Sequence, residues 1–196
     1  MNHFILLITS LFSIGYNIPD LKDGDIIFQT SASKQSELLE TVTKSKYTHV
    51  GIIVKSSNKF YVAEASSKVK ITPLERFISK GKNHRYMVLR SNEINESKFL
   101  KMKTFVKGLL GKNYDLKFQW NNDEMYCSEL VWKAFNRVGI KLSEPKTFRD
   151  FNLSTEVAKR EILKRFKNSI FSLDETVVAP VDIAENKNLK LVFSNY

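Results

Sequence analysis

The sequence predicts an α+β fold in which an antiparallel sheet packs against helices. Segments of strand character gather in the first half of the chain, and helical segments are spaced unevenly between and after them. A doubly wound fold would instead alternate strands and helices regularly. The 196 residues are 42% hydrophobic, which is enough for one substantial core, and this length favours one domain over two.

The predicted strands are short apolar segments bounded by turn residues. The first covers 26–28 and follows a Gly-containing turn at 23–25. Segments 48–54 and 59–65 are dense in apolar and β-branched residues, and the four polar residues 55–58 between them predict the loop of a hairpin. Two further segments of this kind, also expected to be strands, cover 86–89 and 189–193.

The predicted helices place apolar residues at helical spacing. A short helix is expected to start at Thr72-Pro73, because proline suits the first helical position. Gly111 and Gly139 stand where helices would end. The four longer helices are expected over 35–43, 96–110, 123–138 and 155–167. The last of them is expected to turn these apolar residues inward: Ala158, Ile162, Leu163, Phe166 and Ile170.

The first fifteen residues differ from the rest of the chain. Residues 4–14 are almost wholly apolar, and no Lys, Arg, Asp or Glu precedes Asp20. This run is shorter than the ~20 residues that span a bilayer, and it matches the apolar region of a secretory signal. We therefore expect residues 1–15 to be a signal peptide, residues 16–196 to be one domain, and the protein to be exported to the periplasm or cell envelope. A buried first strand or helix is the alternative.

The net charge of +10 favours anionic partners, such as a membrane surface, a cell-wall polymer or nucleic acid. Lys and Arg are spread along the whole chain and interleaved with acidic residues, and no nucleic-acid-binding motif focuses them. A basic solvated surface accounts best for this pattern. An anionic envelope surface stays open as a partner, whereas nucleic acid is not expected.

Cys127 is the only cysteine of the chain, which excludes an intrachain disulfide and a structural zinc site built on several cysteines. It lies three and four residues before Leu130 and Val131, so its thiol belongs to the inward face of the predicted helix. Near the helix N-terminus the dipole favours the thiolate, which is the reactive form. The alternative is a small buried hydrophobic side chain. The position favours a nucleophile.

A thiolate nucleophile needs a base that later acts as an acid, and His49 is the best placed of the three histidines. His3 lies in the expected signal peptide, and His84 lies in a basic polar loop. His49 opens an apolar strand, and Gly51 on the same face leaves room beside the imidazole.

The predicted hairpin brings a carboxylate to His49. A four-residue loop pairs Val54 with Lys59, and counting back puts His49 directly opposite Glu64. Side chains in such a pair lie about 5 Å apart, so Glu64 could accept a hydrogen bond from the imidazole and orient it. This role depends on the register, because a loop one residue longer would turn the two side chains to opposite faces.

These residues belong to a series of short motifs in the order His, acid, Cys. The motifs are Leu21-Lys22-Asp23-Gly24-Asp25-Ile26-Ile27-Phe28-Gln29, Tyr47-Thr48-His49-Val50-Gly51-Ile52, Glu64-Ala65, Tyr126-Cys127-Ser128-Glu129-Leu130-Val131-Trp132 and Val178-Ala179-Pro180-Val181-Asp182. Over residues 20–193 the series resembles the circularly permuted, YiiX-like branch of the NlpC-type papain-fold cysteine peptidases. Papain-like enzymes usually place the cysteine first, and a permutation reverses that order. The resemblance implies a permuted papain-like fold.

The resemblance also implies roles for the matching residues. Cys127 would be the nucleophile, His49 the base, and Glu64 the group that orients His49. Segment 111–115 is similar to the Gly-x-x-Tyr segment that precedes the cysteine helix in this superfamily, although the Gly-Gly that follows the tyrosine in the non-permuted cell-wall enzymes is missing. Three residues are therefore candidates for lining the site or binding the oxyanion: Tyr114, Gln29 and Tyr126.

The expected function is that of an exported cysteine hydrolase that cleaves amide bonds, with cell-wall peptides as the expected substrates. Thiolate chemistry of this kind requires no metal and no organic cofactor. One alternative keeps the triad and acts on a lipid or acyl amide, as a hydrolase or acyltransferase. Another is a non-catalytic binding module, which the intact Cys, His and Glu disfavour. A nucleic-acid binder is supported by charge alone.

Overall fold

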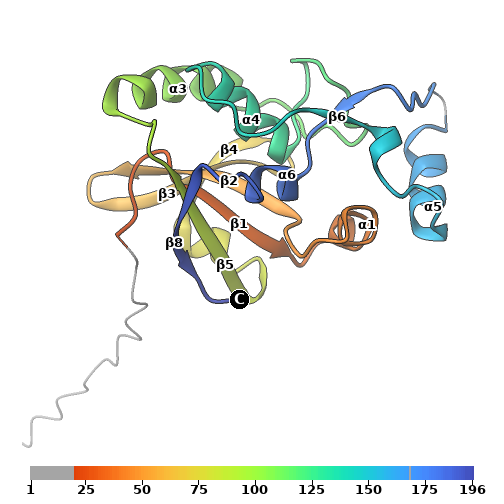
Figure 1. Ribbon diagram of the computed structural model, residues 1–196, viewed down its shortest axis with the longest axis horizontal. Helices are drawn as coiled ribbons and strands as arrows, with labels where there is room; N and C mark the ends of the chain where they lie inside the picture. The colour runs from red at the N-terminus through yellow and green to blue at the C-terminus, as the bar shows by residue number, and fades with distance from the viewer. Residues whose placement is uncertain (1–19, 168) are drawn as a thin grey trace, which may run out of the picture.

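A six-stranded antiparallel sheet forms the centre of the computed structural model, which describes residues 20–167 and 169–196 (Figure 1). The strands follow one another across the sheet in the order β4-β3-β2-β1-β5-β8. They are β1 Ile26–Ser31, β2 His49–Ser56, β3 Lys59–Ala65, β4 Val69–Pro73, β5 Gly81–Ser91 and β8 Leu189–Ser194. Two short strands, β6 Lys146–Thr147 and β7 Thr176–Val177, pair separately. The predicted α+β class with an antiparallel sheet is confirmed, whereas the expected signal peptide lies outside the described residues.

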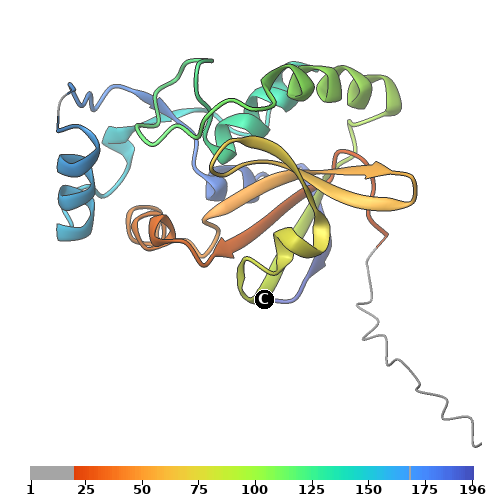
Figure 2. The same cartoon turned by 180° about the vertical axis from the view of Figure 1, so that it is seen from behind.

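Helices cover both faces of the sheet. They are α1 Lys34–Thr43, α2 Leu74–Ile78, α3 Glu96–Leu109, α4 Cys127–Asn136, α5 Glu156–Arg165 and α6 Pro180–Ala184, with a 3-10 turn at Phe148–Asp150. Helices α3, α4 and α6 lie over one face, and α2 packs on the opposite face (Figures 1 and 2). Helices α1 and α5 lie side by side at one end of the sheet. In the part of the chain that the structure describes, no helix has the length and apolar character needed to cross a membrane.

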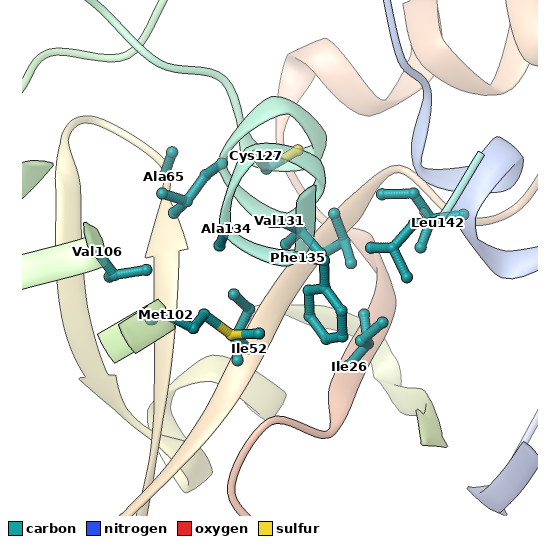
Figure 3. Packing of buried hydrophobic residues seen from close by; sticks show 14 of the residues in the cluster. Ile26, Ile52, Ala65, Met102, Val106, Cys127, Val131, Ala134, Phe135 and Leu142 are labelled. Atoms are coloured by element: carbon teal, nitrogen blue, oxygen red, sulfur yellow. The ribbon is translucent and has the colours of Figure 1, made fainter. Parts of the chain in front are cut away.

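The main core fills the space between α4, α3 and the central strands (Figure 3). Alternate residues of β1 divide between the two faces, so that Ile26 points to this core and Ile27 to the α2 side. Phe135 of α4 is completely buried beside Ile26, and burying such a side chain contributes ~1.5–3 kcal/mol. Figure 3 shows Cys127 at the end of α4, at the margin of this core. Packing therefore fixes the helix that carries the thiol.

The hairpin of β2 and β3 has a different register from the one predicted. Strand pairing runs from Ile52 opposite Ala63 to Ser56 opposite Lys59, so the turn has two residues rather than four. Both turn residues, Ser57 and Asn58, have positive φ (46° and 60°), as a two-residue hairpin turn requires. The predicted pairing of Val54 with Lys59 is therefore wrong by two residues, and His49 is not directly opposite Glu64. A shift of two residues keeps every side chain on its predicted face.

Other boundaries also differ from the prediction. Strand β4 was not expected, and Pro73 closes it instead of opening α2. Helix α4 begins at Cys127 rather than near Asp123, because Met125 donates its N–H to Asn113 and accepts one from Asp115, which holds the preceding segment extended. In and after α5, Leu163 and Ile170 are 74% and 90% exposed, so the expectation that both face inward is wrong.

Candidate active site

Cys127 is the first residue of α4, and the backbone just before it is extended at Tyr126 (φ −96°, ψ 167°). The Glu129 carboxylate accepts the Tyr126 N–H at 3.2 Å and pairs with Lys133 at 2.7 Å, which fixes the point where the helix starts. N–H groups in the first turn have no partner within a helix, and they carry the positive end of its dipole. The thiol therefore sits closer to that positive end than the sequence indicated.

The segment around Val178 is tied to the start of α4. Ser128 Oγ donates to the Val178 carbonyl at 2.7 Å, and the Val178 N–H donates to the Tyr126 hydroxyl at 3.1 Å. The hydroxyl of Tyr126, predicted as an oxyanion candidate, is thus engaged with the backbone of a distant segment. Its ring lines the cavity beside the thiol.

Glu64 and His49 are in direct contact. His49 Nε2 lies 2.6 Å from Glu64 Oε2, and the glutamate is 1% exposed. Thr72 Oγ1 donates to the other carboxylate oxygen at 2.6 Å, and the Lys80 ammonium lies 3.7 Å from it. The imidazole stacks on the ring of Phe77, with centroids 5.4 Å apart. The predicted pair of side chains is therefore brought together, although by a register other than the predicted one.

Gly51 makes this contact compatible with the sheet. A Cβ at this position would lie 2.4 Å from Val62 Cγ1 and 2.9 Å from the Ala63 carbonyl, both closer than packing allows. The same Cβ would lie 3.6 Å from Glu64 Cβ, so the glycine faces the glutamate across the hairpin. With no side chain at Gly51, the His49 ring reaches Glu64 along the diagonal between the strands.

The contact shifts the pKa of both groups. Burial raises the pKa of Glu64, but hydrogen bonds and charge from His49, with the Thr72 hydroxyl and Lys80, lower it to about 2. Burial lowers the pKa of His49, whereas its hydrogen bonds with Cys127 and Glu64 and their negative charges raise it to about 9. Around neutral pH the imidazole therefore carries a proton and the carboxylate does not.

The Cys127 thiol is shifted in the complementary direction. Burial raises its pKa, but the hydrogen bond and charge of His49, with the backbone N–H groups of Val50 and Ser128, bring it below its ordinary value. Opposite shifts in two adjacent groups favour an ion pair of thiolate and imidazolium. This is the state from which a cysteine hydrolase attacks.

Tyr114 lies at the thiol as the sequence predicted. Its hydroxyl accepts a hydrogen bond from Gln35 Nε2 at 2.8 Å. Burial and the negative charge of Cys127 raise the pKa of Tyr114 well above its usual value, so the hydroxyl keeps its proton. A neutral phenol beside the thiolate can donate a hydrogen bond to an oxyanion.

Gln29 does not lie where a residue that binds the oxyanion would lie. It pairs with His49 on the neighbouring strand and lines a polar pocket on the imidazole side. It does not line the cavity beside the thiol. Of the predicted site residues, Cys127, His49 and Glu64 come together, Tyr114 and Tyr126 line the cavity at the thiol, and Gln29 lines the pocket on the imidazole side.

Two residues of the site were missed in the sequence. Thr72 donates to Glu64, and Phe77 supports the His49 ring. The pattern of Val69, Ile71 and Pro73 alternating with polar residues was a weak signal for β4, which carries Thr72. Pro73 obscured it, because proline also marks helix starts.

An apolar cavity opens at the thiol. Its walls come from segments far apart in the chain, including Leu38 of α1, Ile162 of α5, and Phe148. The two charged residues in its wall, Glu161 and Arg165, form an ion pair with each other at 3.2 Å. The cavity therefore presents mainly hydrocarbon to any group bound next to Cys127.

Comparison with known proteins gives consistent matches over almost the whole chain. Residues 20–193 match the family described as permuted papain-like amidase enzyme, YaeF/YiiX, C92 family. The uncharacterized protein YiiX of Escherichia coli strain K12 is 34% identical over 194 residues, which cover 98% of this chain and 96% of that protein. The crystal structure of metalloprotein yiiX from Escherichia coli O157:H7 superposes with a TM-score of 0.84 at 36% identity, covering 89% of this chain and 98% of that one.

Proposed function

The chain belongs to the permuted papain-like amidase family YaeF/YiiX, and we propose that it hydrolyses amides of apolar acyl groups with Cys127 as its nucleophile. The family membership supports a cysteine hydrolase in general. The finer proposal takes His49 as the base and acid, and Glu64 as the group that orients His49. The single observation that carries the choice of substrate is the apolar cavity at the thiol.

The proposed reaction has two stages. The Cys127 thiolate attacks the amide carbonyl and forms a C–S bond, while the Cys127 N–H and the Tyr114 hydroxyl donate to the oxyanion. The C–N bond then breaks as His49 passes its proton to the amine nitrogen. In the second stage His49 takes a proton from water, the resulting hydroxide equivalent attacks the thioester, and the acid leaves as the thiol is restored.

Cell-wall peptides, the substrates expected from the sequence, are the second candidate. The net charge of +10 supports an anionic polymer as a ligand. The lining of the cavity favours an acyl chain instead, because polar peptide groups would lose their hydration there without gaining hydrogen bonds. The opposite pKa shifts of Cys127 and His49 argue against a non-catalytic binding module.

We expect kcat/KM to rise with acyl chain length in a series of N-acyl amides from four to sixteen carbons. Each added methylene that enters the cavity contributes at most ~0.8 kcal/mol, or about fourfold. The substitution Ile162→Ser, in the cavity wall, should lower the preference for long over short chains about tenfold. Product release from each amide is measured by mass spectrometry.

Leu191→Ser is the matched control, because Leu191 of β8 is 65% exposed and does not line the cavity. It should keep the wild-type dependence on chain length. A flat chain-length series together with cleavage of muropeptides would contradict the acyl proposal and favour cell-wall peptides.

We also propose that the protein is exported and acts at an anionic envelope surface. The apolar run 4–14 supports export. The exposed Leu163 and Ile170 stand among basic residues close to the residues that line the acyl cavity, which supports contact with an anionic lipid surface. Fractionation of cells that express the full chain should place it outside the cytoplasm, and recovery in the cytoplasm at full length would contradict export.

The related protein from Escherichia coli O157:H7 is described as a metalloprotein. In residues 20–167 and 169–196 of this chain, no three or more His, Cys, Asp or Glu side chains are grouped so that they could hold a metal ion. His49 Nε2 and Glu64 Oε2, the atoms that could coordinate a metal, are instead hydrogen-bonded to each other. The residues present do not fit a resident metal, and no step of the proposed reaction uses one.

A further inference from the structure

Gln29 is a buried amide without a hydrogen-bond partner. Its side chain is completely buried, and neither Oε1 nor Nε2 has a partner in the described part of the chain. Such a group costs roughly 1–3 kcal/mol when it is left unpaired. An apolar residue of the same size would avoid this cost, so an unpaired amide at this position points to a functional role.

The unpaired groups gather in one place. Four buried polar side-chain atoms lack a partner in the described residues, and three of them belong to Gln29 and Ser66. Both residues line the same polar pocket, together with Ser31, Gln35 and Lys80. The wall of this pocket therefore holds three buried polar atoms that no group in the described part of the chain satisfies.

The polar pocket and the apolar cavity each contain one member of the proposed pair Cys127 and His49. Cys127 lines the apolar cavity and not the polar pocket, whereas His49 lines the polar pocket and not the cavity. The two spaces meet at Tyr114 and Leu39, which line both. A substrate amide lying across Tyr114 would place one end in each space.

We propose that the polar pocket is the subsite for the leaving amine, and that Gln29 and Ser66 bind it. This rests on the proposed function, in which His49 delivers a proton to the departing nitrogen, so that the amine must lie on the imidazole side. The Gln29 amide offers both a donor and an acceptor, and Ser66 adds a hydroxyl. The ligand is therefore an amine that carries its own hydrogen-bonding group, and an alkylamine is disfavoured.

The test compares two substrates that share one acyl chain. N-dodecanoyl glycinamide releases an amine with a primary amide, and N-dodecanoyl isobutylamine releases an alkylamine of similar shape. The ratio of their kcat/KM values should fall at least tenfold in Gln29→Leu, because the polar contact is lost only for glycinamide. Intrinsic differences between the two amines cancel when the ratios of wild type and variant are compared.

The thermal stability of Gln29→Leu distinguishes a ligand-binding role of Gln29 from a structural one. Gln29→Leu removes an unpaired amide, so its thermal unfolding temperature should equal or exceed that of the wild type. If the unfolding temperature of Gln29→Leu falls instead, Ser66→Ala becomes the deciding variant. The ratio of its two kcat/KM values should drop, by a smaller factor than that expected for Gln29→Leu. Gln119→Leu, an exposed position outside the pocket, is the matched control and should keep the wild-type ratio. An unchanged ratio in both Gln29→Leu and Ser66→Ala would overturn the proposal.

Failure of this subsite and failure of the proposed function give different results. The wild-type protein is mixed with p-nitrophenyl dodecanoate, whose leaving group needs no polar subsite, and the burst of nitrophenol reports acylation of Cys127. A burst with no effect of Gln29 or Ser66 on the amide ratio overturns the subsite alone. No burst and no amide cleavage overturn the proposed function as well.

Discussion

Replacing Cys127 by alanine is expected to reduce amide hydrolysis by a factor of about 10⁴ or more, because the proposed acyl-enzyme forms on its sulfur. Cys127 is the only cysteine of the chain and lies at the start of α4, where the helix dipole and the N–H groups of Val50 and Ser128 favour its thiolate. The measurement is the rate of product release from an N-acyl amide, with the purified variant at a concentration equal to that of the wild type.

Two comparisons make this result specific. Cys127→Ala removes only the sulfur from a small buried side chain, so the thermal unfolding temperature should change little. Mass spectrometry of the wild type quenched during turnover should show an acyl group on Cys127, and the variant should carry none. Activity of the alanine variant above one hundredth of the wild-type rate would contradict the assignment of the nucleophile.

The second large effect is expected for Glu64→Gln, which keeps the shape of the side chain and removes its charge. The pKa of His49, about 9 in the native protein, should fall, because Glu64 is one of the two groups that raise it. Fewer molecules then hold the imidazolium and thiolate together near neutral pH, and kcat/KM should drop by about 10²–10⁴. Thr72→Val, which removes one hydrogen-bond donor to Glu64, should lower kcat/KM about tenfold.

Alkylation of the thiol by iodoacetamide as a function of pH measures this change directly. The wild-type thiol should react at a lower pH than an ordinary cysteine, because its pKa is lowered by His49. In Glu64→Gln the reaction should require a higher pH, since a weaker imidazolium stabilises the thiolate less. Hydrolysis by the wild type should decline above about pH 9, where His49 loses the proton that the leaving amine needs. An identical alkylation profile in both proteins would contradict the role of Glu64.

Acid should also destabilise the wild type through this glutamate. The pKa of Glu64 is about 2 in the folded protein, whereas its ordinary value of 4.5 applies in the unfolded chain. The unfolded state therefore binds the proton more tightly. The stability that this carboxylate contributes is therefore complete above about pH 4.5 and is lost as the pH falls toward 2.

The contact of His49 with Glu64 could be predicted from the sequence, although the register of the two strands that carry them could not. The alternation of side chains along β2 and β3 places both residues on one face, and a shift by two residues preserves that face. The loop length was wrong because the polar side chains of residues 55 and 56 resemble a loop, whereas their backbone continues the ladder. Positive φ angles at Ser57 and Asn58 close the turn, and their sequence gives only a weak signal for this.

Other parts of the site depend on distances that a sequence does not encode. The acyl cavity joins α1, α5, the turn at Phe148 and the segment around Val178, which are separated by up to 140 residues along the chain. The free amide of Gln29 could be recognised only once its surroundings were known, because a glutamine at the end of a strand is ordinarily satisfied by solvent or backbone. The helix start at Cys127 depended on the backbone pairing of Met125 with Asn113.

The presence of one thiol in a folded, buried position gives this protein a built-in active-site count. Denatured protein titrated with a thiol reagent reports one equivalent for every chain, since Cys127 is the sole cysteine. Native protein titrated at pH 6 reports only the chains in which His49 is in place to activate that thiol. The quotient of the two titrations is the fraction of competent molecules in any preparation, and rates divided by this fraction can be compared between variants without assuming equal folding.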